Sequence, residues 1–199
     1  MLILLATWND IKVEWLTKGF SHLGFTIRPV NRHEVEDAEE NGSTCAENAL
    51  IKVRAIGAKE NIIIIGEDSA LSINVLNGFP GVKTVRWMEG TDDDRSIELL
   101  KKLNDVPQEK RCAKFISSIA VLFPNGDEKV FTGELKGSIT TELVGEEGKG
   151  YQRIFLLPGG KTLAQSNSTL INENDHRDQA MKKAAEEILN WLDKRKEIK

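Results

Sequence analysis

Hydrophobic residues along the chain follow two patterns, short continuous runs and longer stripes with helical spacing. The continuous runs predict buried strands at residues 2–6, 62–65 and 154–157. The stripes predict helices at about residues 10–23, 44–58, 92–103 and 176–195. Further strands are predicted at 25–30, 71–76, 114–123 and 128–137, with a hairpin turn at Pro124-Asn125-Gly126-Asp127 before the last one. This succession predicts a mixed α/β fold in a single domain over residues 1–199, with two lobes around a cleft as its expected form.

Composition and charge exclude several classes of partner. The formal net charge is -4, and a nucleic-acid backbone requires a basic surface, so no nucleic-acid partner is expected. Neither the apolar run at residues 1–6 nor any other segment reaches the length of a signal peptide or a membrane span. Cys45 and Cys112 form no spacing motif and are predicted to be free thiols. These observations predict a cytoplasmic protein without a membrane partner.

The first polar cluster lies where the strand at residues 2–6 leads into a helix. Backbone N–H groups at the helix start could bind a phosphate together with the Thr7 hydroxyl, the Asn9 amide and the Lys12 ammonium. The alternative is structural, with Asn9 capping the helix and Lys12 facing solvent.

The second cluster, Gly66-Glu67-Asp68-Ser69, follows the strongest strand pattern in the chain. Open α/β sheets bind ligands at such strand ends, and one or two carboxylates are typical ligands of Mg²⁺. The alternative is a solvated acidic turn.

The third cluster precedes the helix at 44–58. Thr44 and Glu47 form a capping box, which explains Glu47 structurally. Glu39 and Glu40 have no such explanation, and either could join Asp68 on a metal ion.

The fourth cluster begins the last helix. Asp175 has the chemistry of an N-cap. His176 and Arg177 oppose the helix dipole in the first turn, which favours a role in ligand binding.

Taken in this order, the clusters resemble the inosine triphosphate pyrophosphatase family. The matching stretches span nearly the whole chain: LATWNDIK, EENGSTCAENALIK, GEDSALSINVLNGFPGVKTVRW, FTGELKGSI, GKGY and DHRDQAM. The resemblance implies an elongated, curved mixed β-sheet flanked by helices, with two lobes around a central cleft, and a homodimer. It also implies Mg²⁺-dependent hydrolysis of a nucleoside triphosphate to the monophosphate and pyrophosphate, as in sanitation of the nucleotide pool.

The resemblance also implies roles for individual residues. It assigns the phosphates to Thr7, Asn9, Lys12, Lys52 and Ser69. It assigns the metal to Glu39 and Asp68, with Glu40 as the alternative to Glu39, and makes Asp68 the catalytic residue. It assigns the base to Lys149, Gly150, Tyr151, Gln152, Asn172, His176 and Arg177.

The chain departs from the family pattern at the base end. Lys149-Gly150-Tyr151-Gln152 stands where the family has Phe-Gly-Tyr-Asp, followed by Arg153 in place of proline; Gln165, Ile171 and Asp175 are further departures. The hypothesis is that hydrolysis persists, on either the family-typical substrates (ITP, dITP, XTP) or an altered base such as a modified purine or a pyrimidine. A non-catalytic nucleotide-binding protein is the remaining alternative, and the retained Lys12, Glu39 and Asp68 weigh against it.

Overall fold

The computed structural model describes residues 1–33, 35, 38–166 and 175–197. The chain forms two compact units, each built from separate segments. Unit 1 comprises residues 1–69, 117–133 and 173–199, and unit 2 comprises residues 70–116 and 134–172. Whether the two units act as one domain stays a prediction.

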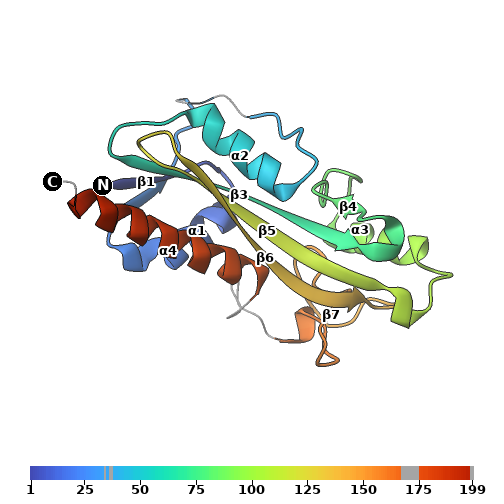
Figure 1. Cartoon of the computed structure of the whole chain (residues 1–199). Helices are drawn as coiled ribbons and strands as arrows, with labels where there is room; N and C mark the ends of the chain where they lie inside the picture. The colour runs from blue at the N-terminus through green and yellow to red at the C-terminus, as the bar shows by residue number, and fades with distance from the viewer. Residues whose placement is uncertain (34, 36–37, 167–174, 198–199) are drawn as a thin grey trace. The chain divides into compact units, whose positions relative to one another are not determined.

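The elements follow the expected alternation of strands and helices (Figure 1). The strands are β1 (Leu2–Leu5), β2 (Thr26–Pro29), β3 (Ile62–Ile73), β4 (Pro80–Gly81), β5 (Cys112–Leu122), β6 (Glu128–Ile139) and β7 (Phe155–Leu156). The α-helices are α1 (Asp10–Phe20), α2 (Cys45–Ile56), α3 (Asp92–Lys102) and α4 (His176–Glu197). Short 3₁₀ helices are η1 (Ser21–Leu23), η2 (Asn74–Leu76), η3 (Gln108–Lys110) and η4 (Ala164–Ser166).

The strands form a mixed sheet in the order β2-β1-β3-β5-β6-β7, and β4 pairs with β3. β1 runs parallel to both β2 and β3, whereas β4 and β7 pair antiparallel with β3 and β6. The predicted class, a mixed sheet flanked by helices, is therefore confirmed. The central cleft and the homodimer stay predictions.

β3 differs from the prediction in its length. Separate strands were predicted at 62–65 and 71–76 with a turn between them, but one strand runs from Ile62 to Ile73 and residues 74–76 form η2. The prediction was wrong because Glu67 and Asp68 have the composition of a turn. Their charges are instead compensated inside an extended strand by cations on neighbouring helices.

Helices cover both faces of the sheet in unit 1 (Figure 1). Leu4 and Ile64 share a buried cluster with Ala49 and Val53 of α2. Because successive side chains of a strand point to opposite faces, Ile63 and its odd-numbered neighbours in β3 face the other way, where α1 and α4 lie. Odd- and even-numbered side chains of β3 therefore meet different helices.

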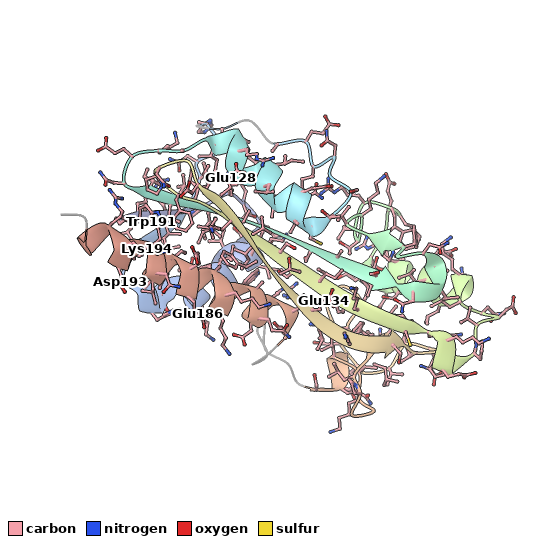
Figure 2. All side chains as sticks on the ribbon, viewed as in Figure 1. Glu128, Glu134, Glu186, Trp191, Asp193 and Lys194 are labelled. Carbon is pink, nitrogen blue, oxygen red and sulfur yellow. The ribbon has the colours of Figure 1, made fainter. Side chains whose placement is uncertain are left out.

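The start of α4 is packed tightly on β6. A Cβ atom on Gly133 would lie 2.1 Å from the carbonyl oxygen of His176, so only glycine permits this approach. Further along, Trp191 stacks on Phe123 at 5.1 Å between ring centroids. Exposed Glu186, Asp193 and Lys194 lie on the outer side of the helix (Figure 2). The first turn of α4 is thereby fixed against the sheet.

Unit 2 has its own core. Its buried residues include Leu71, Leu99, Ile139, Tyr151 and Phe155, so strands β3 and β6, helix α3 and the segment leading into β7 all contribute. Burial of Tyr151 and Phe155 anchors that segment. No helix in the described part of the chain is long and apolar enough to cross a membrane.

Candidate active site

The polar cluster after β1 lies at an open edge of the sheet in unit 1. The parallel pairing of β1 with β3 ends at Leu5 and Ile65, so β3 continues past the end of its neighbour. The chain turns there into α1: Asn9 N–H donates to Thr7 Oγ1 (3.3 Å), and Asn9 Oδ1 accepts from the backbone N–H of Lys12 (3.2 Å). Asn9 is thus the helix cap, as its structural interpretation predicted. The positive end of α1 points toward this edge.

Lys12 does not face solvent freely. Its Nζ lies 2.8 Å from Glu67 Oε2, and 22% of its side chain is exposed. Burial disfavours the ammonium, but the attraction of Glu67, Asp68 and Glu40 outweighs it and raises the pKa of Lys12. Lys12 therefore carries a positive charge at neutral pH.

Glu67 is the most deeply buried carboxylate of the site, with 1% of the residue exposed. Ser117 Oγ donates to Glu67 Oε1 at 2.9 Å, and Lys12 pairs with the other oxygen. Burial raises the pKa of Glu67, but Lys12, Arg177 and Lys52 lower it more, so the group stays ionised. No role was assigned to Glu67 beyond its place beside Asp68. A charged residue inside an apolar strand pattern was the signal that could have revealed it.

Asp68 contacts side chains of α2, on the opposite face of β3 from Lys12. Asn48 Nδ2 donates to Asp68 Oδ2 at 3.1 Å, and Lys52 Nζ lies 3.4 Å from Asp68 Oδ1. Burial raises the pKa of Asp68, and Lys52 and Lys12 oppose that rise. Ser69, half-buried, follows along the same edge. A buried carboxylate between an amide and an ammonium can position water or a metal ion.

A close approach of α2 to β3 brings Asn48 and Lys52 to this place. A Cβ atom on Gly66 would lie 2.6 Å from the carbonyl oxygen of Ala49, so glycine allows the helix to pack directly on the strand. Lys52 Nζ also donates to the Glu67 carbonyl oxygen at 2.9 Å, and only 11% of its side chain is exposed. Lys52 is therefore part of the site and not a solvated surface residue.

The acidic loop before α2 contributes Glu40 rather than Glu39. Glu40 Oε1 lies 2.9 Å from Lys52 Nζ, the ammonium that also contacts Asp68, whereas Glu39 is exposed. Asn48 Oδ1 accepts from the N–H of Gly42 at 2.8 Å and holds the loop on α2. Glu40 and Asp68 thus contact the same ammonium, and the assignment of either glutamate to a metal ion stays a prediction.

The carboxylates around Lys52 do not form a closed metal cage. Among residues 1–33, 35, 38–166 and 175–197, no group of three or more His, Cys, Asp and Glu side chains could enclose one. Mg²⁺ needs no such cage, because it keeps several waters and takes one or two carboxylates together with substrate phosphates. Asp68 and Glu40, grouped around one lysine, fit that requirement.

The first turn of α4 adds a further cation, Arg177, near Glu67. Asp175 Oδ1 accepts from the N–H groups of Arg177 and Asp178, both at 2.8 Å, so its prediction as an N-cap is confirmed. Burial, aided by Arg177, lowers the pKa of His176 to about 4 and keeps the imidazole neutral at pH 7. The Arg177 guanidinium lies 5.9 Å from the Trp15 ring and lowers the pKa of Glu67.

The loop expected to contact the base lies in unit 2. Tyr151 is buried, its hydroxyl donates to the carbonyl oxygen of Thr84, and Trp87 Nε1 donates to that hydroxyl at 2.8 Å. Burial raises the pKa of Tyr151. The Tyr151 hydroxyl therefore holds this part of unit 2 together, and the assignment of Tyr151 to the base stays a prediction.

Two of the residues that depart from the family pattern hold local turns. Gln152 Oε1 accepts from the N–H of Lys149 at 3.0 Å, and Gln165 Oε1 accepts from the N–H of Thr162 at 3.0 Å. The Lys149 side chain is exposed. The two remaining predicted positions, Asn172 and Ile171, lie outside the described residues.

The predicted site residues fall into two groups. Those assigned to the phosphates and metal lie together in unit 1, with His176 and Arg177. Lys149, Gly150, Tyr151 and Gln152 lie in unit 2. Convergence of the second group with His176 and Arg177 on one base stays a prediction.

Comparisons with known proteins agree with the resemblance drawn from the motifs. The model of the Ham1 family matches residues 3–187. A Halalkalibacterium halodurans protein named "Non-canonical purine NTP pyrophosphatase homolog" is 38% identical over 191 residues, covering 96% of this chain and 97% of its own. A dITP/XTP pyrophosphatase of Symbiobacterium thermophilum is 37% identical over 186 residues, covering 94% of each.

A solved structure supports the same relationship. The HAM1 protein from Coxiella burnetii superposes with a TM-score of 0.85 at 30% identity, covering 96% of this chain and 99% of its own. Sequence and fold thus agree over nearly the whole length, and the family predicted from the motifs is confirmed. The chain belongs to the Ham1 family.

Proposed function

We propose that the chain hydrolyses a nucleoside triphosphate to the nucleoside monophosphate and pyrophosphate, with Mg²⁺ as cofactor. The observation that carries this proposal is the grouping of Lys12, Lys52 and Asp68 around the open edge of β3. Phosphoryl transfer needs little covalent chemistry from a protein; it needs charge neutralisation and a positioned nucleophile. Relatives named dITP/XTP pyrophosphatase support the same reaction class.

Charge balance at the site supports a metal cofactor. The cations are Lys12, Lys52 and Arg177, and the carboxylates are Glu40, Glu67 and Asp68, three of each. A bound triphosphate would add several negative charges to this neutral set. Mg²⁺ held by Asp68 and Glu40 would supply the missing positive charge at the phosphoryl oxygens.

Individual residues then have distinct roles. Lys12, kept charged by Glu67, and the N-terminal N–H groups of α1 hold phosphate oxygens, aided by Thr7 and Ser69. The Lys52 ammonium contacts the carboxylates of Glu40 and Asp68 and binds phosphate oxygens of the substrate. Asp68 orients the attacking water and accepts its proton.

Replacing Asp68 by Asn removes the proposed base but keeps its size and its contact with Asn48. We expect pyrophosphate release to fall at least about 100-fold on every accepted substrate, the lower range for loss of a general base. The measurement is pyrophosphate release with Mg²⁺ from a panel of standard and modified triphosphates, with Asp105→Asn, an exposed carboxylate of unit 2, as the control. An unchanged rate would move the base elsewhere. No release by the wild type from any triphosphate would favour the nucleotide-binding alternative.

Glu40 is proposed as the second metal ligand in place of Glu39, because Glu40 contacts the Lys52 ammonium that also contacts Asp68. Glu40→Gln should raise the Mg²⁺ concentration for half-maximal activity roughly tenfold or more, because a metal-facing carboxylate is lost. Glu39→Gln, the matched control one residue earlier, should leave it unchanged, because Glu39 is exposed. Magnesium titrations of both variants decide the matter, and the reverse pattern would assign the metal to Glu39.

The base preferred by the site is proposed to differ from that of relatives with aspartate at position 152. Gln152 Oε1 accepts from the N–H of Lys149, and the amide NH₂ gives this side chain a donor for a ligand. An aspartate would offer only acceptors. This reversal favours an altered base over the family-typical ITP, dITP and XTP.

Gln152→Asp should therefore shift kcat/KM toward ITP and XTP, by about tenfold relative to the wild type's preferred substrate, as one polar contact changes sign. Gln108→Asp is the control, because Gln108 is an exposed glutamine of the same unit to which the resemblance assigns no role. Steady-state kinetics on the panel provide the measurement. An unchanged substrate ranking in Gln152→Asp would exclude residue 152 from base recognition.

A further inference from the structure

The segment before α3 and its first turn hold the loop that contains Gly150 at three points. Tyr151 contacts Thr84 and Trp87 through its hydroxyl. The N–H of Gly150 donates to Asp92 Oδ2 at 2.6 Å. Arg153 Nη1 lies 2.5 Å from Asp93 Oδ2, and Arg153 Nε donates to the carbonyl oxygen of Gly145. Gly150, Tyr151 and Arg153 are thus attached to the segment before α3 or to its first turn, whereas Gln152 accepts from Lys149 within the loop.

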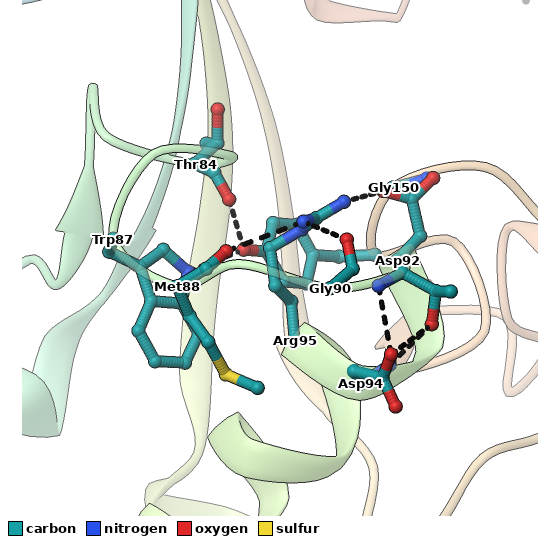
Figure 3. A network of polar contacts seen from close by, with 10 residues as sticks. Thr84, Trp87, Met88, Gly90, Asp92, Asp94, Arg95 and Gly150 are labelled. Carbon is teal, nitrogen blue, oxygen red and sulfur yellow. Dashed lines mark hydrogen bonds and ion pairs between the residues drawn. The ribbon is translucent and has the colours of Figure 1, made fainter.

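Asp92 is itself held in place by a buried arginine. Arg95 is 7% exposed and lies in the first turn of α3, near the positive end of the helix dipole, where a cation is unfavourable. Its guanidinium donates to the carbonyl oxygen of Gly90 at 2.6 Å and to Asp92 Oδ1 at 2.6 Å (Figure 3). Asp92 compensates the buried charge with one oxygen, and this contact directs the other oxygen at Gly150.

The bond to Gly150 constrains the loop at its most permissive residue. Gly150 has φ +60°, in the left-handed region that glycine adopts without strain. Nothing lies within 4 Å of the position of a Cβ atom there, so packing does not fix this residue. The short charge-assisted hydrogen bond from the Gly150 N–H to Asp92 does so instead. The positions of Lys149 and Gln152, on either side of Gly150 and Tyr151, therefore depend on this hydrogen bond.

We propose that Asp92, oriented by Arg95, is a positioning residue that sets the conformation of residues 149–153 and thereby the affinity for the nucleobase. It acts through the Gly150 amide and has no contact with the reacting phosphates. The inference rests on the proposed function, in which this loop contacts the base. Beyond that function, it assigns control of nucleobase recognition to a carboxylate on α3, outside the loop.

The test compares Asp92→Ala with Asp94→Ala. Asp94 caps the same helix turn by accepting from the N–H and hydroxyl of Thr91, but it does not contact the loop. Both variants lose a carboxylate in the first turn of α3, so both lower stability. Only Asp92→Ala removes the contact with Gly150. Asp92→Asn, which keeps one acceptor oxygen, is the conservative variant.

Two measurements separate positioning from stability. Amide hydrogen exchange of Gly150, followed by NMR, should accelerate in Asp92→Ala and remain slow in Asp94→Ala. In kinetics, Asp92→Ala should raise KM for the triphosphate that the wild type prefers by about tenfold or more, as expected for a lost charge-assisted bond, while kcat changes less than about twofold. Hydrolysis of methyl triphosphate, which lacks a base, should be equal in both variants. The KM of Asp92→Asn should lie between that of the wild type and that of Asp92→Ala.

Several outcomes would overturn the proposal. Unchanged Gly150 exchange in Asp92→Ala would show that the contact does not hold the loop. Equal KM changes in Asp92→Ala and Asp94→Ala, or an equal loss on methyl triphosphate, would reduce Asp92 to a structural role. A wild type that releases no pyrophosphate from any triphosphate would refute the proposed function instead, and with it the loop's role in recognition; the Gly150 exchange result would still stand.

Discussion

A carboxylate buried within an apolar strand requires a cation beside it, and the contact between Glu67 and Lys12 meets that requirement. Desolvating an ionised carboxylate costs several kcal/mol unless its charge is paired and its remaining lone pairs accept hydrogen bonds. Lys12 supplies the charge at 2.8 Å, and Ser117 supplies a hydrogen bond. With both in place, β3 can run through Glu67 and Asp68 without a break. The site is therefore part of the sheet.

This constraint also organises the surrounding helices. α1 must begin where β1 ends so that Lys12 reaches Glu67, and Asn9 caps the helix at that point. α2 must approach Gly66 closely so that Lys52 reaches Asp68 from the other face. Because successive carboxylates of a strand point to opposite faces, one helix cannot serve both. The resulting preorganised charges are suited to phosphoryl chemistry, which depends on electrostatics already in place before the substrate binds.

Local signals in the sequence predicted much of this structure. The capping box of Thr44 and Glu47 and the N-cap Asp175 were correct because their partners lie within one helical turn. The partnership of Lys12 with Glu67 could not be predicted, because it joins residues that only the parallel pairing of β1 and β3 brings together. For the same reason, β3 was divided into two strands and Glu67 received no role of its own. What the sequence could not supply is contacts between residues that lie far apart along the chain.

The unfolding stability of one single variant and one double variant tests the central role of the pair most directly. Lys12→Met leaves Glu67 buried without its ion partner, and we expect it to lower the free energy of unfolding by about 3 kcal/mol. This is the lower end for buried pairs, because 22% of the Lys12 side chain is exposed. In the double variant Lys12→Met/Glu67→Gln, urea denaturation should return stability to within about 1 kcal/mol of the wild type. A neutral Lys12→Met variant, or a double variant no more stable than Lys12→Met alone, would contradict this account.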